Sequence, residues 1–220
     1  MKRGFTLIEM LVVIGIIVVL MAAALGAYSK MAATADRTNG QELVSNVATA
    51  LNVYFQEHGR WPNALLSAAS GKTGGKVLDE KAAKVFARNK LITVSYLEDK
   101  ETKEVRLTGL DRFGIVSPWA TRTLKRKGVT GGSADSINVV TGGTVKDHLL
   151  HFDIDTDGKG FVETSVGGNR IKVRANAIVW CAGRDGVMVP YPYAGGNSGK
   201  ATKGRISDDC YSWTPLQVEK

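Results

Sequence analysis

The sequence predicts an α+β protein, in which one long N-terminal helix precedes a set of short strands. A nearly uninterrupted apolar run is followed by an amphipathic stripe that reaches His58, so the two read as one helix. From Asp147 onward, short apolar segments alternate with turn residues, which is typical of antiparallel strands. The chain has 220 residues, 44% of them hydrophobic and 23% charged, which is the composition of a globular protein.

The apolar run extends from Phe5 to Tyr28, and Glu9 is its only charged residue. A helix of this length, with about 1.5 Å rise per residue, roughly spans a hydrocarbon core of about 30 Å. Lys2 and Arg3 precede the run, which favours a cytoplasmic N-terminus. The alternative is a secretory signal that is cut near the small residues 22–24.

Glu9 is the informative residue of this run, because a carboxylate at the bilayer centre costs on the order of 2.5–3.5 kcal/mol and usually has a partner. A cut after Gly4 would give Phe5 a free α-amine, whose reference pKa is about 7.7–8.0. This amine, from the same chain or from a neighbouring subunit, is a candidate partner. The alternative is that Glu9 stays at the membrane interface, in contact with water.

The segment from Lys2 to Val13 reads Lys-Arg-Gly-Phe-Thr-Leu-Ile-Glu-Met-Leu-Val-Val. It resembles the leader and mature N-terminus of type IV prepilins and type II secretion pseudopilins. The resemblance implies cleavage between Gly4 and Phe5 by a prepilin peptidase, and N-methylation of Phe5. It also implies that Glu9 neutralises the N-terminal amine of an adjacent subunit during filament assembly.

The resemblance implies a pilin-like fold and divides the chain into four parts. Residues 1–4 are the leader, and residues 5–28 are the hydrophobic half of the helix, transmembrane before assembly and in the filament core afterwards. Residues 29–58 are the amphipathic half, and residues 59–220 are an α+β head with a C-terminal loop. Gly59 and Pro62 end the helix near His58. The residues from Tyr54 to Pro62 resemble the exit of this helix in the major pseudopilins.

Within the head, the patterns predict one helix, several strands and one exposed loop. The helix spans Asp79 to Asn89, and residues 120–146 are expected to be the loop. Asp157-Gly158 predicts a hairpin between the third and fourth of the expected strands. The expected strands are Leu91 to Leu97, Glu104 to Leu107, Leu149 to Ile154, Phe161 to Val166, Ile171 to Val173 and Ala177 to Cys181.

One candidate calcium site consists of Asp153, Asp155 and Asp157, which alternate along an expected strand and would share one face. The pattern opens a calcium-binding loop, but its twelfth position is Thr164, and Glu163 falls one residue early. The alternative is a solvated hairpin end.

A second candidate calcium site comes from resemblance alone. The segments 180–186 and 208–213 resemble C-terminal elements of the major pseudopilins, which implies that Asp185 and Asp209 are calcium ligands. The chain departs from that family by a longer insert, Val187 to Ser207, and by Cys210 in place of a common isoleucine. The alternative is a plain surface loop, and calcium is the only cofactor that the sequence suggests.

Cys181 and Cys210 are the only cysteines. Translocation would bring both into an oxidising compartment, where a disulfide could form. It would close a loop of roughly thirty residues, worth on the order of 3–4 kcal/mol in the chain-entropy model. The alternative is a pair of buried thiols.

Catalytic patterns are not found, so we expect a structural protein and no enzyme. Gly71-Lys72-Thr73 lacks the upstream glycine of a phosphate loop. His148 and His151 have the wrong spacing for a zinc helix and are expected to be strand or surface residues. Nucleic acid is not an expected partner, because a solvated loop explains the basic run 122–127.

These features predict a subunit of a helical homo-oligomer, specifically the major pseudopilin of a type II secretion system. Such a subunit polymerises at the inner membrane and pushes cargo outward. The expected partners are other copies of the chain, prepilin peptidase, minor pilins or pseudopilins, and an inner-membrane assembly platform with a separate ATPase. The precursor would cross the inner membrane once, with its head in the periplasm.

Two alternatives stay open for the function. The first is a subunit of a surface type IV pilus for adhesion, motility or DNA uptake, which would be extracellular. The second is a periplasmic enzyme or binding protein that an uncut helix anchors in the membrane.

Overall fold

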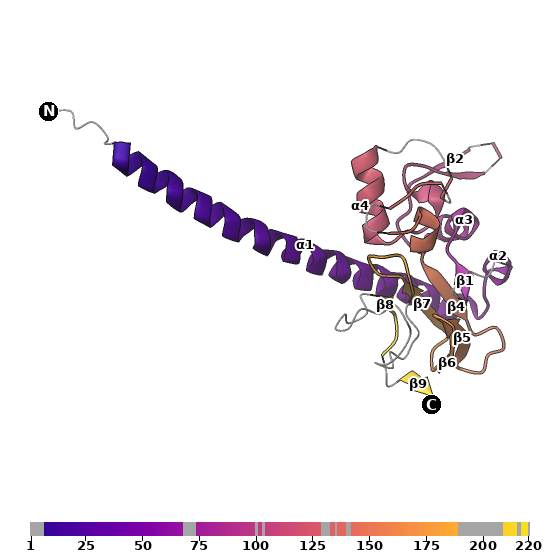
Figure 1. Cartoon of the computed structure of the whole chain (residues 1–220). Coiled ribbons are helices and arrows are strands. Elements are labelled where there is room, and N and C mark those ends of the chain that lie inside the picture. The colour runs from indigo at the N-terminus through magenta and orange to yellow at the C-terminus, as the bar shows by residue number, and fades with distance from the viewer. Residues whose placement is uncertain are drawn as a thin grey trace.

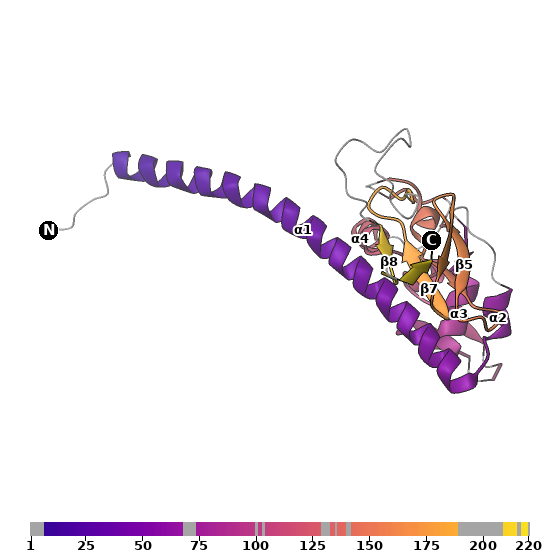
Figure 2. The same ribbon diagram turned by 90° about the horizontal axis from the view of Figure 1, so that it is seen from below.

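One helix dominates the molecule. The computed structural model describes residues 7–67, 74–99, 101–102, 104–128, 133–134, 136–139, 142–188, 209–214 and 217–219. Helix α1 (Leu7–His58) has 52 residues; its first half projects from the head as a gently curved rod, and its second half lies along the head (Figures 1 and 2). The last turn closes with a 2.8 Å hydrogen bond from the Gly59 amide to the Phe55 carbonyl, and Gly59 has a φ of 64°. The predicted helix and its end near His58 are confirmed.

In the part of the chain that the structure describes, three antiparallel sheets form the β part of the head. The sheet next to α1 has the strand order β1 (Lys76–Val77), β4 (His151–Ile154), β7 (Ala177–Cys181) and β8 (Cys210–Tyr211). A second sheet has the order β5 (Val162–Val166), β6 (Asn169–Val173) and β9 (Val218–Glu219), and a third pairs β2 (Tyr96–Glu98) with β3 (Val105–Leu107). The predicted α+β class is confirmed.

Short helices complete the head. Helix α3 (Glu80–Arg88) begins at Asp79, whose carboxylate accepts a 3.0 Å hydrogen bond from the Ala82 amide, as the predicted N-cap requires. The other helices are α2 (Asn63–Leu66), α4 (Pro118–Lys127) and the 3-10 turns η1 (Asp111–Phe113) and η2 (Val145–His148).

The main core lies between the amphipathic half of α1, helix α3 and the first sheet. Val47 and Leu51 of α1 are fully buried there, together with Phe86 of α3 and Phe152 of β4. A separate cluster forms around Trp180 and the second sheet. The amphipathic stripe therefore faces the head, and the head covers only the C-terminal half of the helix.

Residues 120–146 are not the predicted exposed loop. Helix α4 begins at Pro118, after an extended Ser117, and ends at Gly128, whose φ of 56° is the left-handed conformation that favours glycine. Ala120 and Leu124 are fully buried and form a third apolar cluster with residues from the segment up to Leu149. Because α4 contains several basic and few apolar residues, the sequence pattern did not indicate its amphipathic helix.

The predicted hairpin at Asp157-Gly158 is also wrong. Strand β4 pairs with β1 and β7, whereas β5 pairs with β6 in the other sheet. The Asp155 carboxylate accepts hydrogen bonds from the amides of Asp157, at 3.1 Å, and Gly160, at 2.6 Å. These bonds hold a wide turn, which carries the chain from one sheet to the other.

Candidate functional site: the long helix and its junction with the head

The N-terminal half of α1 has no cover in a single copy of the chain. Residues Leu7–Leu25 have the length and composition of a membrane span, and none of that segment is buried. Leu7 is 82% exposed and Leu25 is 70% exposed. Apolar area costs roughly 25 cal/mol per Å² when water covers it, so this surface requires either lipid or other protein.

Glu9 lies in the first turn of α1 and is exposed. A carboxylate in this position interacts favourably with the positive end of the helix dipole. Gly4 and Phe5 lie outside the described residues, so the cleavage and the methylation stay predictions. The role of Glu9 in assembly also stays a prediction.

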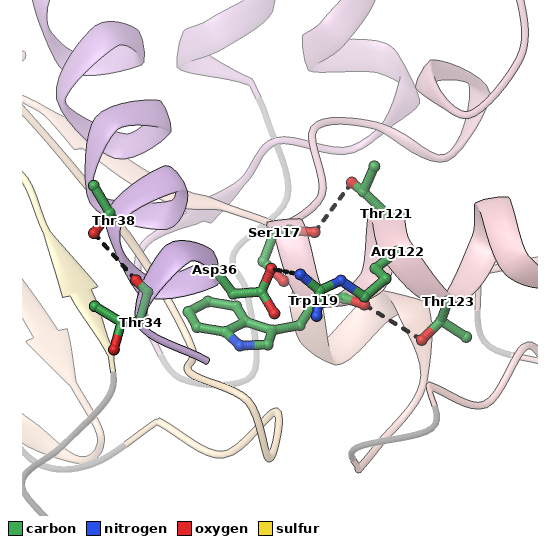
Figure 3. A network of polar contacts seen from close by, with 8 residues as sticks. All are labelled: Thr34, Asp36, Thr38, Ser117, Trp119, Thr121, Arg122 and Thr123. Carbon is green, nitrogen blue, oxygen red and sulfur yellow. Dashed lines mark hydrogen bonds and ion pairs between the residues drawn. The ribbon is translucent and has the colours of Figure 1, made fainter. Parts of the chain in front are cut away.

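An ion pair joins the long helix to the head. The Arg122 guanidinium of α4 donates a hydrogen bond to the Asp36 carboxylate of α1, and the two side chains point toward each other in Figure 3. The Asp36 side chain is only 8% exposed, whereas that of Arg122 is 56% exposed. A buried carboxylate without its partner would be costly, so the pair holds α4 against α1.

The same junction depends on a glycine of α1. A Cβ atom at Gly40 would lie 3.0 Å from the Sγ atom of Cys210 and 3.3 Å from the ring of Trp119. Gly40 is buried, and α1 continues through it. The glycine therefore lets β8 and α4 approach the helix closely.

Gly40→Leu is expected to lower the free energy of unfolding by about 1–3 kcal/mol, because overpacking forces Trp119 and Cys210 apart from the helix. Denaturant unfolding of the full chain in detergent measures this loss. Gly15→Leu is the matched control, since a Cβ at that helical glycine meets nothing within 4 Å. Equal stability of the two variants would contradict the packing role of Gly40.

The structure brings the two cysteines together. Cys181 of β7 and Cys210 of β8 are register partners in neighbouring strands, and both are buried free thiols in this structure. A hydrogen bond with Cys210 is the main cause that raises the pKa of the Cys181 thiol well above its usual value, and burial of the thiol is the second cause. The pairing satisfies the proximity that a disulfide requires, and the disulfide itself stays a prediction.

The carboxylates of Asp185 and Asp209 accept hydrogen bonds from backbone amides and do not line an open metal site. The buried Asp209 carboxylate accepts hydrogen bonds from the Gly183 amide, at 2.7 Å, and from the Tyr211 hydroxyl, at 3.1 Å. The exposed Asp185 accepts one from the Val187 amide at 3.0 Å. Among the described residues, no group of three or more His, Cys, Asp or Glu side chains could hold a metal ion. This donor set does not form a calcium shell, and calcium binding stays a prediction.

Asp209→Ala is expected to lower the free energy of unfolding by roughly 1.5–3 kcal/mol, since it leaves the buried Gly183 amide and the half-buried Tyr211 hydroxyl without their charged acceptor. The loss should be the same in calcium and in a chelator, measured by thermal unfolding. Asp185→Ala is the control, and we expect little effect from it because its carboxylate is exposed. A loss that appears only in calcium would instead establish Asp209 as a metal ligand.

The other three aspartates do not share one strand face. Strand β4 ends at Ile154, so strand geometry does not extend to Asp155 and Asp157. Asp155 holds the wide turn, whereas Asp157 is exposed and forms a 2.7 Å ion pair with Lys159. Burial raises the pKa of the Asp153 carboxyl. The prediction that these carboxylates line up is wrong.

The sequence reasoning missed Asp36, Arg122 as its partner, and the position of His148. The paired residues are 86 positions apart in the sequence, so no local pattern could connect them. His148 is fully buried, not a strand or surface residue: its Nδ1 lies 3.3 Å from the Ser117 hydroxyl and its Nε2 lies 2.8 Å from the Gly142 carbonyl. The His148 ring therefore connects Ser117, at the start of α4, with Gly142, in the segment that follows this helix.

Comparison with known proteins finds matches at the N-terminus and in pilins. Residues 1–25 match the prokaryotic N-terminal methylation motif. The chain is 27% identical over 136 residues to a type IV major pilin protein PilE1 of Neisseria gonorrhoeae. The matched residues make up 62% of this chain and 76% of that pilin. A second PilE1 protein of the same organism is 29% identical over 48% of this chain and 64% of its own length.

A fimbrial protein, EcpC of Eikenella corrodens, is 32% identical over 43% of this chain and 62% of its own length. The chain thus spans slightly less than two thirds of the length of two of these three relatives. No solved structure matches the chain significantly. The relatives are named as pilins and fimbrial proteins, which agrees with the expectation of a structural protein rather than an enzyme.

The leader-like N-terminus, the single long helix with its exposed apolar half, and these relatives agree with one another. The chain therefore carries the prokaryotic N-terminal methylation motif and is similar to type IV major pilins and fimbrial proteins.

Proposed function

We propose that the chain is the repeating subunit of a type IV pilus. The observation that carries the proposal is the apolar half of α1, which is exposed over its whole length in a single copy. Lipid covers this surface in the precursor. In a filament the same surface packs against copies of itself, in an open head-to-tail arrangement that does not close into a ring.

The junction at Asp36 and Arg122 supports this role. A filament subunit transmits force between its helix and its head, so the two must stay in a fixed relation. The ion pair connects α1 to α4, and the close packing at Gly40 connects α1 to β8 and α4. Helix α4 and strand β8 lie at the side of the head from which α1 projects (Figure 2). Prepilin peptidase and an inner-membrane assembly machinery with a separate ATPase are the further partners in this proposal.

A periplasmic pseudopilus of a type II secretion system is the second candidate. The helix exit from Tyr54 to Pro62 and the C-terminal segments 180–186 and 208–213 favour it by their resemblance to the major pseudopilins. The names of the relatives favour the surface pilus instead, since they are type IV major pilins and fimbrial proteins.

Intact mass and N-terminal sequencing of protein from native cells test the proposal. We expect a start at methylated Phe5 in fibres that are sheared from the cell surface. Recovery from the cell envelope alone would favour the pseudopilus, and a start at Met1 or a cut near residue 24 would overturn the filament proposal. The mass also shows whether Cys181 and Cys210 are oxidised to a disulfide.

A further inference from the structure

A groove runs along the side of α1 where the helix meets the head. It consists of two adjoining hollows of about 720 and 460 Å³, which share Asn46 and Leu91 as lining residues. Helix α1 lines one wall, and the segment 89–95 after α3 lines the other. The smaller hollow contains Val53, which is 44% exposed, and the exposed Lys90.

Lys90 occupies a position that favours glycine. Its φ is 52°, and it is the only residue other than glycine with a positive φ in the part of the chain that the structure describes. The Lys90 amide donates to the Ala87 carbonyl at 3.1 Å, and the Leu91 amide donates to the Phe86 carbonyl at 3.0 Å. These bonds end α3 in a Schellman motif, whose left-handed residue is most often glycine. The chain thus holds a lysine side chain at the groove despite a conformational cost.

The groove continues the uncovered surface of the N-terminal half of α1. Val53 and Asn46 lie at helical spacing from Met31 and Tyr28, which are 75% and 73% exposed. This exposed face of α1 therefore runs from the apolar half of the helix, through the exposed residues Ala35, Asn39 and Glu42, to the smaller hollow. A second copy that covers the apolar half would follow this exposed face toward Lys90.

We infer that the groove is a contact between subunits, in which a second copy of this chain seats against Val53 and places a carboxylate next to the Lys90 ammonium. This inference rests on the proposed filament function. In the part of the chain that the structure describes, the Lys90 side chain forms no ion pair or hydrogen bond, so its ammonium is available to a partner. The exposed Glu98 at the end of β2 and the exposed Asp99 that follows it are one source of such carboxylates.

Two substitutions of Lys90 separate a role in assembly from a role in folding. Lys90→Gly removes the conformational cost, so the melting temperature of the full chain in detergent should rise by about 2–4 °C. The same variant should yield roughly tenfold fewer sheared filaments, which corresponds to about 1.4 kcal/mol of interface free energy. Lys90→Glu should reduce filaments at least as strongly.

Lys81→Glu is the matched control, because Lys81 is an exposed lysine of α3 that does not line the groove. Its filament yield should equal that of the unmodified chain. Normal filament yields from both Lys90 variants would overturn the inference.

Alkylation of Val53→Cys measures cover of the groove directly. The native cysteines are buried, so a maleimide should label the new thiol in detergent-dissociated subunits and be excluded from it in intact filaments. Equal labelling in both states would overturn the groove contact while the filament proposal stands. Failure of the unmodified chain to form filaments would instead overturn the proposed function, and the groove contact with it.

Discussion

Glu9→Ala is expected to leave leader cleavage intact and to abolish filaments. The peptidase would act at residues 4 and 5, whereas Glu9 would be needed only when the helix enters the apolar filament core. There the carboxylate would neutralise the Phe5 amine of an adjacent subunit, and the substitution would leave that amine without a counter-charge in a medium of low dielectric. The measurement is the intact mass of the variant together with the amount of sheared filament.

Glu163→Ala is the matched control, because Glu163 is an exposed glutamate of β5 and lies outside α1. We expect normal filaments from it. Normal filaments from Glu9→Ala would exclude the charge pair as a requirement for assembly, and loss of cleavage would place Glu9 in peptidase recognition instead.

Acidification from pH 6.5 to pH 4 is expected to remove about 3 kcal/mol from the free energy of unfolding through His151. Burial lowers the pKa of this histidine from 6.5 to about 4, because its ring is stacked against Trp180 at a centroid distance of 5.7 Å. The unfolded chain therefore binds a proton in this range that the folded chain does not. The contribution of His151 is complete above pH 6.5 and is lost as the pH falls toward 4.

The test is denaturant unfolding at pH 7, 5.5 and 4, with His151→Phe as the comparison. The phenyl ring keeps the stacked shape and cannot titrate, so the variant should lose most of the slope across this range. Asp153 acts in the opposite direction, because its raised pKa favours the protonated folded state, and it will reduce the net effect. An equal slope in the variant would show that the acid sensitivity lies elsewhere.

The long helix could be predicted because its signals are local and repeated. The apolar run, the stripe that includes Val47 and Leu51, and the stop at Gly59 each occur within one or two turns of the residues they organise. Helix α3 was found for the same reason, since Asp79 is a recognisable N-cap. Elements whose own sequence determines them are visible without tertiary information.

Helix α4 and the path from β4 to β5 could not be predicted in this way. Helix α4 has few apolar residues, and its Ser117-Pro118 start and Gly128 end were outweighed by basic and polar residues. The Asp157-Gly158 dipeptide predicts a tight hairpin locally, but Asp155 captures the amide of Gly160 and widens the turn. In both cases side chains that act across the fold decide the outcome.

The residues of the candidate site also fall into those that a local motif predicts and those that only the folded head brings together. Glu9 and the predicted cleavage site follow from a local motif, whereas the contact of Asp36 with Arg122 depends on two helices that meet only in the folded head (Figure 3). The cysteines are an intermediate case. Their number and their expected compartment predict a disulfide, and the register of β7 and β8 places them opposite each other.

The stretch of α1 between Leu7 and Asp36 acts as a lever arm of about 44 Å, at about 1.5 Å per residue. A change of about 10° in the angle at the Asp36 junction would move the free tip of the helix by roughly 8 Å, which is the spacing between packed helices. Such a displacement would exchange one neighbouring helix for the next. In a filament, the angle between α1 and the head at Asp36, Gly40 and Trp119 would therefore decide which copies touch at the far end of the helix.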